Sequence, residues 1–132
     1  MKEAEIDFPV VKGRFQLGQT EYVETLQHVT DIEAQLCLNQ LSYVFFGHEM
    51  VNGRWPEAGK ISFDEFLALR KENMFIVESR KKFHRETNPK NPFSGQMRIN
   101  QIRKQGNIYL ARLGFDLNEK ACDGELSLVL KL

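Results

Sequence analysis

A cluster of polar residues stands immediately before a long apolar stretch, and its residue types could do chemistry. Histidine is the residue type that suits general-base work near neutral pH, and His28 is followed closely by Thr30, Asp31 and Glu33. Residues 34–46 are then largely apolar. Because a buried helix has free N–H groups at its N-terminus, a helix that begins here could hold a developing negative charge. This is the minimum equipment for acyl-thioester chemistry.

The helix that must position this cluster is predicted over residues 30–46. Thr30 and Glu33 have the spacing of a capping box, in which the threonine oxygen accepts a backbone N–H and the glutamate reaches back. Gly47 is the usual left-handed stop. Apolar residues occupy nearly every side of this helix, which predicts that other elements wrap around it.

One strand is predicted before this helix, over residues 6–17 with a possible bend at Gly13. A short second helix is predicted over residues 62–70, with Ser62 and Glu65 at capping spacing. Alternating apolar and polar residues predict four more strands, at 73–85, 96–103, 107–117 and 125–132. The last three are expected to form an antiparallel meander. The sum is α+β: a five-stranded antiparallel sheet wrapped around a long central helix, the hotdog fold, as a single domain over residues 1–132.

Composition and charge restrict the partners. Lys plus Arg and Asp plus Glu number 18 each, so nothing points to nucleic acid. No apolar run is long enough to span a bilayer and the first residues carry no apolar signal segment, so we expect a cytoplasmic protein without a membrane partner. Exposed sheet edges favour pairing of two copies, so we expect a homodimer or a higher homo-oligomer.

Several kinds of catalytic site are not expected. Cys37 and Cys122 do not make a disulfide framework, and Cys37 suits the core. His48 and His84 have no cysteine or acid at metal-ligand spacing, so we predict no metal and no cofactor. There is also no Gly-x-Ser-x-Gly elbow, so we expect no serine nucleophile of the classical kind.

Two blocks of residues occur in the same order in a known family. The first comprises Gly13-Arg14-Phe15, Gly18, Tyr22, His28, Glu33 and the run Leu36-Cys37-Leu38-Asn39-Gln40-Leu41-Ser42-Tyr43. The second comprises Ser62-Phe63-Asp64-Glu65-Phe66, Ser79-Arg80, Phe83, Asn88-Pro89 and Gly124-Glu125-Leu126. Over roughly residues 8–130 the chain thus resembles the FcoT-like family, the mycobacterial type III fatty-acyl-CoA thioesterases.

The resemblance implies a hotdog fold, a homo-oligomer and hydrolysis of long-chain acyl thioesters by tyrosine and asparagine side chains. Tyr22 and Asn39 match the family's tyrosine and helix asparagine, and Thr30 stands where the family has a second asparagine. The family's further tyrosine lies on an N-terminal segment that this sequence does not include. Some members in isonitrile lipopeptide pathways are similar but instead add glycine to an enoyl thioester on a carrier protein and then release the product.

The candidate catalytic residues are Tyr22, His28, Thr30, Asp31 and Asn39, and each also has a purely structural interpretation. Asn39 shares an apolar stripe with residues one turn away, so it either bonds a nearby backbone group or holds a water or the thioester carbonyl. Thr30 is most simply an N-cap, which leaves the N–H groups beyond it as oxyanion donors. His28 is either structural or a general base, as in hotdog dehydratases, and Asp31 is an available base.

The candidate substrate-binding residues are Leu36, Tyr43, Arg80 and Lys82. The acyl chain is expected between helix and sheet, against Leu36 and Tyr43 together with Leu38 and Phe45. Arg80 and Lys82 belong to a basic block that is either a solvated face or a landing site for the phosphates of coenzyme A or an acidic carrier protein.

Three hypotheses for the function follow. The first is hydrolysis of an acyl thioester of coenzyme A or an acyl carrier protein. The second keeps the pocket but changes the reaction, to addition of an amine to an enoyl thioester or removal of water from a 3-hydroxyacyl thioester. The third is a dimer that binds acyl thioesters without turning them over.

Overall fold

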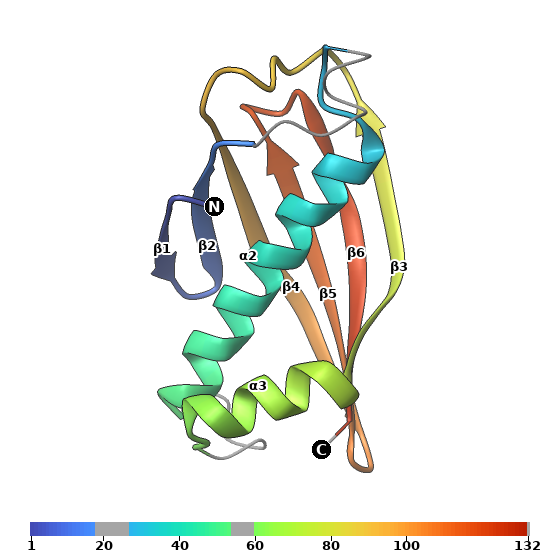
Figure 1. The fold of residues 1–132 in the computed structure, drawn as a ribbon. Coiled ribbons are helices and arrows are strands. Elements are labelled where there is room, and N and C mark those ends of the chain that lie inside the picture. Colours follow the sequence, from blue (N-terminus) through green and yellow to red (C-terminus); the bar gives the residue numbers. More distant parts are fainter. Residues whose placement is uncertain (18–26, 54–59, 132) are drawn as a thin grey trace.

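The structure is a computed structural model of the chain, and it describes residues 1–17, 27–53 and 60–131. Within them lie two helices, α2 (Asp31–Val51) and α3 (Phe63–Glu72). The strands are β1 (Glu3–Asp7), β2 (Val10–Phe15), β3 (Met74–Phe83), β4 (Phe93–Gln105), β5 (Ile108–Leu117) and β6 (Cys122–Lys131). They form one antiparallel sheet in the order β1-β2-β4-β5-β6-β3, with α2 lying across one face (Figure 1). The architecture is therefore α+β.

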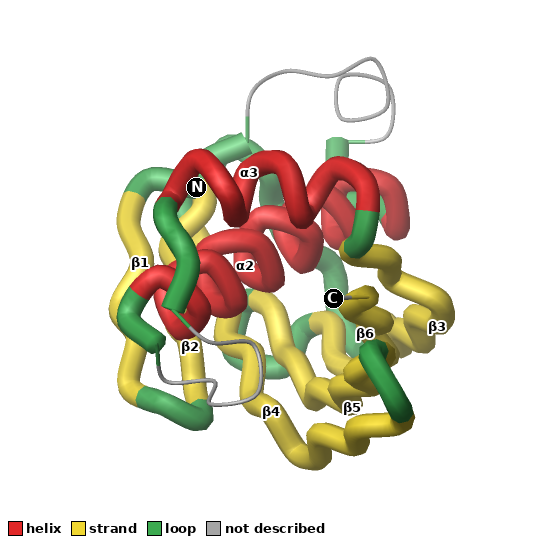
Figure 2. Tube along the Cα trace, turned by 90° about the horizontal axis from the view of Figure 1, so that it is seen from below, coloured by secondary structure: helices red, strands yellow, loops and turns green. Residues whose placement is uncertain are grey.

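Alternation of apolar and polar residues decides which face of the sheet meets α2. In β5 every second side chain is buried, from Tyr109 to Leu117. Partner positions on β6 are buried in the same way, including Leu126 and Leu128. Successive side chains of a strand point to opposite faces, so these residues form one apolar surface beneath the helix. Figure 2 shows the sheet curving around α2, with α3 on the side of α2 that faces away from the sheet.

The later strands and the second helix confirm the sequence predictions to within a few residues. β4, β5 and β6 form the antiparallel meander, and β3 then pairs with β6 at the sheet edge. The α3 capping box is present, since the Ser62 hydroxyl accepts from the Glu65 N–H at 3.1 Å and the Glu65 carboxylate accepts from the Ser62 N–H at 3.3 Å.

The sheet has six strands rather than the five predicted, because residues 6–17 are not one strand. A turn at Phe8-Pro9 divides them into the hairpin of β1 and β2. Proline lacks the N–H that a strand ladder needs, so it suits a turn between two strands. Gly13 is no bend: it lies within β2, where a Cβ atom would stand 2.8 Å from Leu41 Cδ2. Its missing side chain lets α2 pack closely on the sheet.

The helix α2 runs further than predicted, to Val51 instead of ending at Gly47. A Cβ atom on Gly47 would lie 3.0 Å from the ring of Phe66, so this glycine allows α3 to dock and does not stop the helix. The helix ends where Asn52 donates from both its backbone N–H and its side chain to the His48 carbonyl. Gly53 follows with a left-handed φ of 69°.

The prediction that α2 is wrapped on nearly every side is wrong for this chain. Leu38, Leu41 and Phe45 are completely buried against the sheet, but Ile32 and Leu36 are 48% and 51% exposed. One side of the helix is therefore open, and we call it the open side of α2; it carries Ile32, Leu36, Asn39 and Tyr43.

Candidate active site

A pocket of about 390 Å³ lies at the N-terminal end of α2. It is lined by His28, Val29, Thr30 and Asp31 before and at the helix start, and by Phe83, His84, Arg85 and Glu86 at the end of β3. The Val29 N–H donates to the Thr87 carbonyl at 2.9 Å and ties the two segments together. Three of the predicted catalytic residues, His28, Thr30 and Asp31, thus line one pocket. Tyr22 lies outside the described residues.

Thr30 is the N-cap residue, but the predicted capping box is not formed. Its backbone is extended and its carbonyl accepts the first helical hydrogen bond, from the Ala34 N–H at 3.0 Å. Its hydroxyl donates to the carboxylate of Glu33 instead of accepting a backbone N–H. Glu33 is only 1% exposed, and its Oε1 has no hydrogen-bond partner among the described residues. Burial thus directs Glu33 inward, away from the backbone that a capping box would satisfy.

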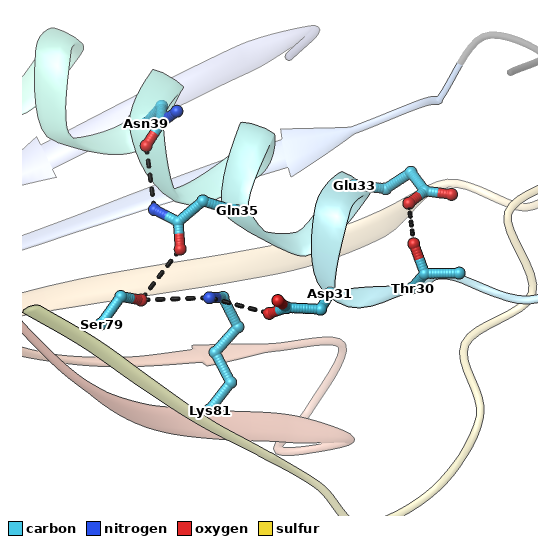
Figure 3. A network of polar contacts seen from close by, with 7 residues as sticks. All are labelled: Thr30, Asp31, Glu33, Gln35, Asn39, Ser79 and Lys81. Carbon is cyan, nitrogen blue, oxygen red and sulfur yellow. Dashed lines mark hydrogen bonds and ion pairs between the residues drawn. The ribbon is translucent and has the colours of Figure 1, made fainter. Parts of the chain in front are cut away.

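A chain of polar contacts joins α2 to β3 beside this pocket (Figure 3). The Lys81 ammonium lies 2.9 Å from an Asp31 carboxylate oxygen and donates to Ser79 Oγ at 3.1 Å. The Ser79 hydroxyl donates to Gln35 Oε1 at 2.9 Å, and Gln35 Nε2 donates to Asn39 Oδ1 at 3.0 Å. We call this chain of five residues the Lys81 relay.

The side chain of Asn39 therefore bonds another side chain and not a nearby backbone group. The asparagine is partly buried and stands on the open side of α2, one turn from exposed Leu36 and partly buried Tyr43. An amide held in place on an otherwise apolar surface is able to form a further hydrogen bond to a bound molecule.

The predicted path of the acyl chain needs correction. Leu38 and Phe45 are 0% exposed and belong to the core against the sheet, whereas Leu36 is on the open side. These residues do not line one channel, because a helix places positions two apart on different faces.

Tyr43 lies at a second pocket of about 400 Å³, formed between α2 and α3. Its apolar lining includes Val44, Phe63 and Phe66, and the Arg70 guanidinium stands over the Tyr43 ring at 5.3 Å from the centroid. Leu36 and Tyr43 are separated by about 10 Å along the helix axis.

The basic residues of β3 divide between the two faces of the strand. Lys81 faces α2, and only 8% of its side chain is exposed. Arg80 is 74% exposed and contacts Glu78 at 3.0 Å and Glu125 at 3.9 Å, and Lys82 is exposed as well. Arg80 and Lys82 thus lie on the face of the sheet opposite to the Lys81 relay.

Sequence reasoning missed Gln35, Ser79 and Lys81. The signal that could have found Ser79 and Lys81 is the two-residue alternation of β3, which separates Lys81 from Arg80 and Lys82. A register irregularity between Ile76 and Glu78 shifts that alternation by one residue. The local sequence does not predict where such an irregularity occurs.

Neither cysteine is equipped to act as a nucleophile. Burial raises the pKa of the Cys37 thiol from its ordinary 9.0 to about 12, and burial raises the pKa of Cys122 to about 11. The reactive form of cysteine is the thiolate, so both groups are inert near neutral pH.

Within residues 1–17, 27–53 and 60–131, no three His, Cys, Asp or Glu side chains come together as a metal site would require. No helix there has the length and apolar character to cross a membrane.

The amino-acid sequence is similar to one protein family and to several enzymes with assigned names. The family model described as the FcoT-like thioesterase domain matches residues 2–130. A (2E)-enoyl-ACP glycyltransferase of Mycobacterium marinum is 27% identical over 100 residues, which are 76% of this chain and 54% of that protein. Proteins with the same name from Mycobacterium tuberculosis and Streptomyces coeruleorubidus are 26% and 22% identical, over 63% and 86% of this chain and 45% and 73% of their own lengths. The chain spans about half the length of the mycobacterial relatives.

Proposed function

Because this chain belongs to the FcoT-like thioesterase domain family, we propose that it is an enzyme that acts on an enoyl or acyl thioester of an acyl carrier protein or coenzyme A. The reaction we favour is addition of an amine, glycine, to a 2-enoyl thioester. Support comes from the names of its relatives, which are (2E)-enoyl-ACP glycyltransferases. The hotdog fold, with its sheet curved around a central helix, is part of the same proposal.

The observation that carries the proposal is the amide of Asn39 on the open side of α2. In the addition, the amine nitrogen forms a bond to C3 of the enoyl group and the C2–C3 double-bond electrons move toward the carbonyl oxygen. A proton then returns to C2. The carbonyl oxygen carries most of the developing negative charge, so a fixed hydrogen-bond donor beside it lowers the barrier.

The remaining candidates have distinct parts in this scheme. His28, in the pocket at the N-terminus of α2, is the proposed general base that takes the proton of the glycine ammonium group. Thr30 and Asp31 line the same pocket, and Tyr22 is the proposed hydroxyl donor carried over from the family. The acyl chain would run along Leu36 toward Tyr43 and the second pocket. Arg80 and Lys82, on the opposite face, would meet a carrier protein or the phosphates of coenzyme A.

Hydrolysis is the second candidate, favoured by the description of the family as thioesterases. It uses the same site, with water in place of the amine and the oxyanion of a tetrahedral intermediate in place of the enolate. The raised pKa values of both thiols favour direct attack of water or amine over an acyl-cysteine intermediate.

We also propose that the protein is a homodimer. β3 is an edge strand, and its residues Phe75 and Val77 are 43% and 59% exposed. Covering these side chains removes apolar area from water and gives the edge strand a partner.

The reaction is tested by incubating the purified protein with saturated, 2-enoyl and 3-hydroxyacyl thioesters, on coenzyme A and on a carrier protein, with and without glycine. Intact-mass analysis then identifies the products. An enoyl thioester that gains one glycine supports the favoured reaction, and free acid from saturated thioesters without glycine supports hydrolysis. Interconversion of enoyl and 3-hydroxyacyl species, or binding without any product, contradicts both. Asn39→Ala should lower kcat by about 100-fold or more, whereas Asn100→Ala on the exposed outer face of the sheet should leave kcat unchanged.

A further inference from the structure

The hydrogen bonds of the Lys81 relay all run in one direction, from the Lys81 ammonium group through Ser79 and Gln35 to the Asn39 amide. An ammonium group cannot accept, so Ser79 Oγ must accept from Lys81 Nζ. The Ser79 hydroxyl then donates its own hydrogen to Gln35 Oε1. With its oxygen committed to Ser79, Gln35 has Nε2 available to donate to Asn39 Oδ1. Each contact thus favours the observed orientation of the next amide.

The consequence falls on Asn39. Its oxygen is the acceptor of the Gln35 hydrogen bond, so its two N–H groups are the ones available to a bound molecule. Without the relay the amide could present either end, because the oxygen and nitrogen of an asparagine exchange places by a half-turn of the side chain.

Burial and charge hold the start of the relay in place. The Lys81 side chain is 8% exposed and has Asp31 as its counter-ion at 2.9 Å. A buried ammonium group keeps its hydrogen bonds because losing one leaves an uncompensated charge. Hydrogen bonds in such a chain also polarise one another, which strengthens the terminal donor.

We propose that Lys81, Ser79 and Gln35 are positioning residues that set the amide of Asn39 as a hydrogen-bond donor toward the substrate. The substrate group at Asn39 is therefore an acceptor, the thioester carbonyl oxygen, and the donor becomes stronger as that oxygen gains charge. This inference rests on the proposed function. It assigns the oxyanion to Asn39 and not to the N-terminus of α2, whose first turn already holds the acidic side chains of Asp31 and Glu33.

The decisive variant is Gln35→Glu, which keeps the size of the side chain. A glutamate at position 35 still accepts from the Ser79 hydroxyl but has no N–H for Asn39. Asn39 must then turn its own N–H toward position 35 and present its oxygen to the substrate. We expect kcat to fall by about 100-fold, the loss typical of one oxyanion donor, with KM within about twofold of the parent.

Matched variants separate this effect from charge and from folding. Gln40→Glu places the same charge on exposed α2 surface outside the relay, and it should retain the parent kcat. Lys81→Met removes the donor at the start of the relay and should lower kcat at least about twofold, since an Asn39 amide that is free to present either end has its donor end toward the substrate about half of the time. Lys81→Arg retains donors and should recover most of that loss. Circular dichroism and the concentration of folded protein accompany each assay, so that kcat refers to folded molecules.

Every outcome decides between the inference and the proposed function. If Asn39→Ala is inactive while Gln35→Glu keeps kcat within twofold of the parent, Asn39 keeps its role in the proposed function. The Lys81 relay then does not orient the Asn39 amide, and the inference is overturned. If Asn39→Ala is fully active, the proposed function loses its carrying residue. If Gln35→Glu does not fold, Ser79→Ala replaces it, since it removes the hydroxyl that ties Lys81 to Gln35. Parent kcat in folded Ser79→Ala would overturn the inference, and a loss of kcat without a change in KM would support it.

Discussion

The ion pair of Asp31 and Lys81 should respond very unequally to removal of its two members. The Asp31 side chain is 70% exposed, whereas the Lys81 side chain is 8% exposed. Asp31→Asn leaves a buried ammonium group without its counter-ion, and after allowance for water at the exposed partner we expect a loss of about 1–2 kcal/mol in unfolding free energy. Lys81→Met keeps the apolar stem and leaves only an exposed carboxylate that water can solvate, so we expect a change within about 0.5 kcal/mol.

The assay is urea denaturation of the parent, both single variants and the double variant, followed by circular dichroism at fixed protein concentration. The double variant should be about as stable as Lys81→Met, because removing the cation also removes the penalty of leaving it unpaired. A cost for Lys81→Met equal to or larger than that for Asp31→Asn would refute the reasoning from burial. An additive double variant would show that the two groups are not coupled.

Three further predictions concern the frame around the site. Gly124→Ala should lower the unfolding free energy by about 2–3 kcal/mol, because its Cβ would stand 1.8 Å from the Arg80 carbonyl oxygen at a φ of 158°; urea denaturation measures this, and a loss below 0.5 kcal/mol contradicts it. Val77→Lys should convert a dimer to a monomer in light scattering, since it places a charge on the exposed edge strand; a parent that is already monomeric contradicts the proposed dimer. Because burial raises the pKa of Cys37 from 9.0 to about 12, this thiol ionises first in the unfolded chain. The folded protein therefore keeps its full stability below pH 9 and loses part of it between pH 9 and 12. In chemical denaturation above pH 9, the unfolding free energy of Cys37→Ala should therefore fall less steeply with pH than that of the parent. Identical slopes of unfolding free energy against pH would contradict this.

The sheet was largely predictable from the sequence, because its strands have one buried and one exposed face. The alternation in β5 and the residues around Gly106 locate the meander directly. The hairpin of β1 and β2 was missed because residues 6–17 have the composition of a single strand. The two-residue turn at Phe8-Pro9 interrupts that strand near its start. The end of α2 was misplaced because Gly47 makes room for the Phe66 ring of α3 and does not stop the helix. This is a tertiary contact, which the local sequence does not show.

The candidate site was predicted in part, and the limit is physical. His28, Thr30 and Asp31 are neighbours in sequence, so a local pattern brings them to one helix end. The bond between Ser79 and Gln35 joins residues 44 positions apart, and it depends on how β3 passes the helix after an irregular register. Spacing within a segment carries no information about such a contact, which is why the Lys81 relay was not anticipated.

The central claim is that an acyl thioester binds on the open side of α2 with its carbonyl oxygen at Asn39. The most direct measurement is a crystal structure of the protein with an unreactive enoyl-pantetheine analogue in which an amide replaces the thioester. The account predicts the carbonyl oxygen within hydrogen-bond distance of Asn39 Nδ2 and the acyl chain directed along Leu36 toward Tyr43. An analogue bound with its carbonyl away from Asn39, or seated outside the open side of α2, would contradict it.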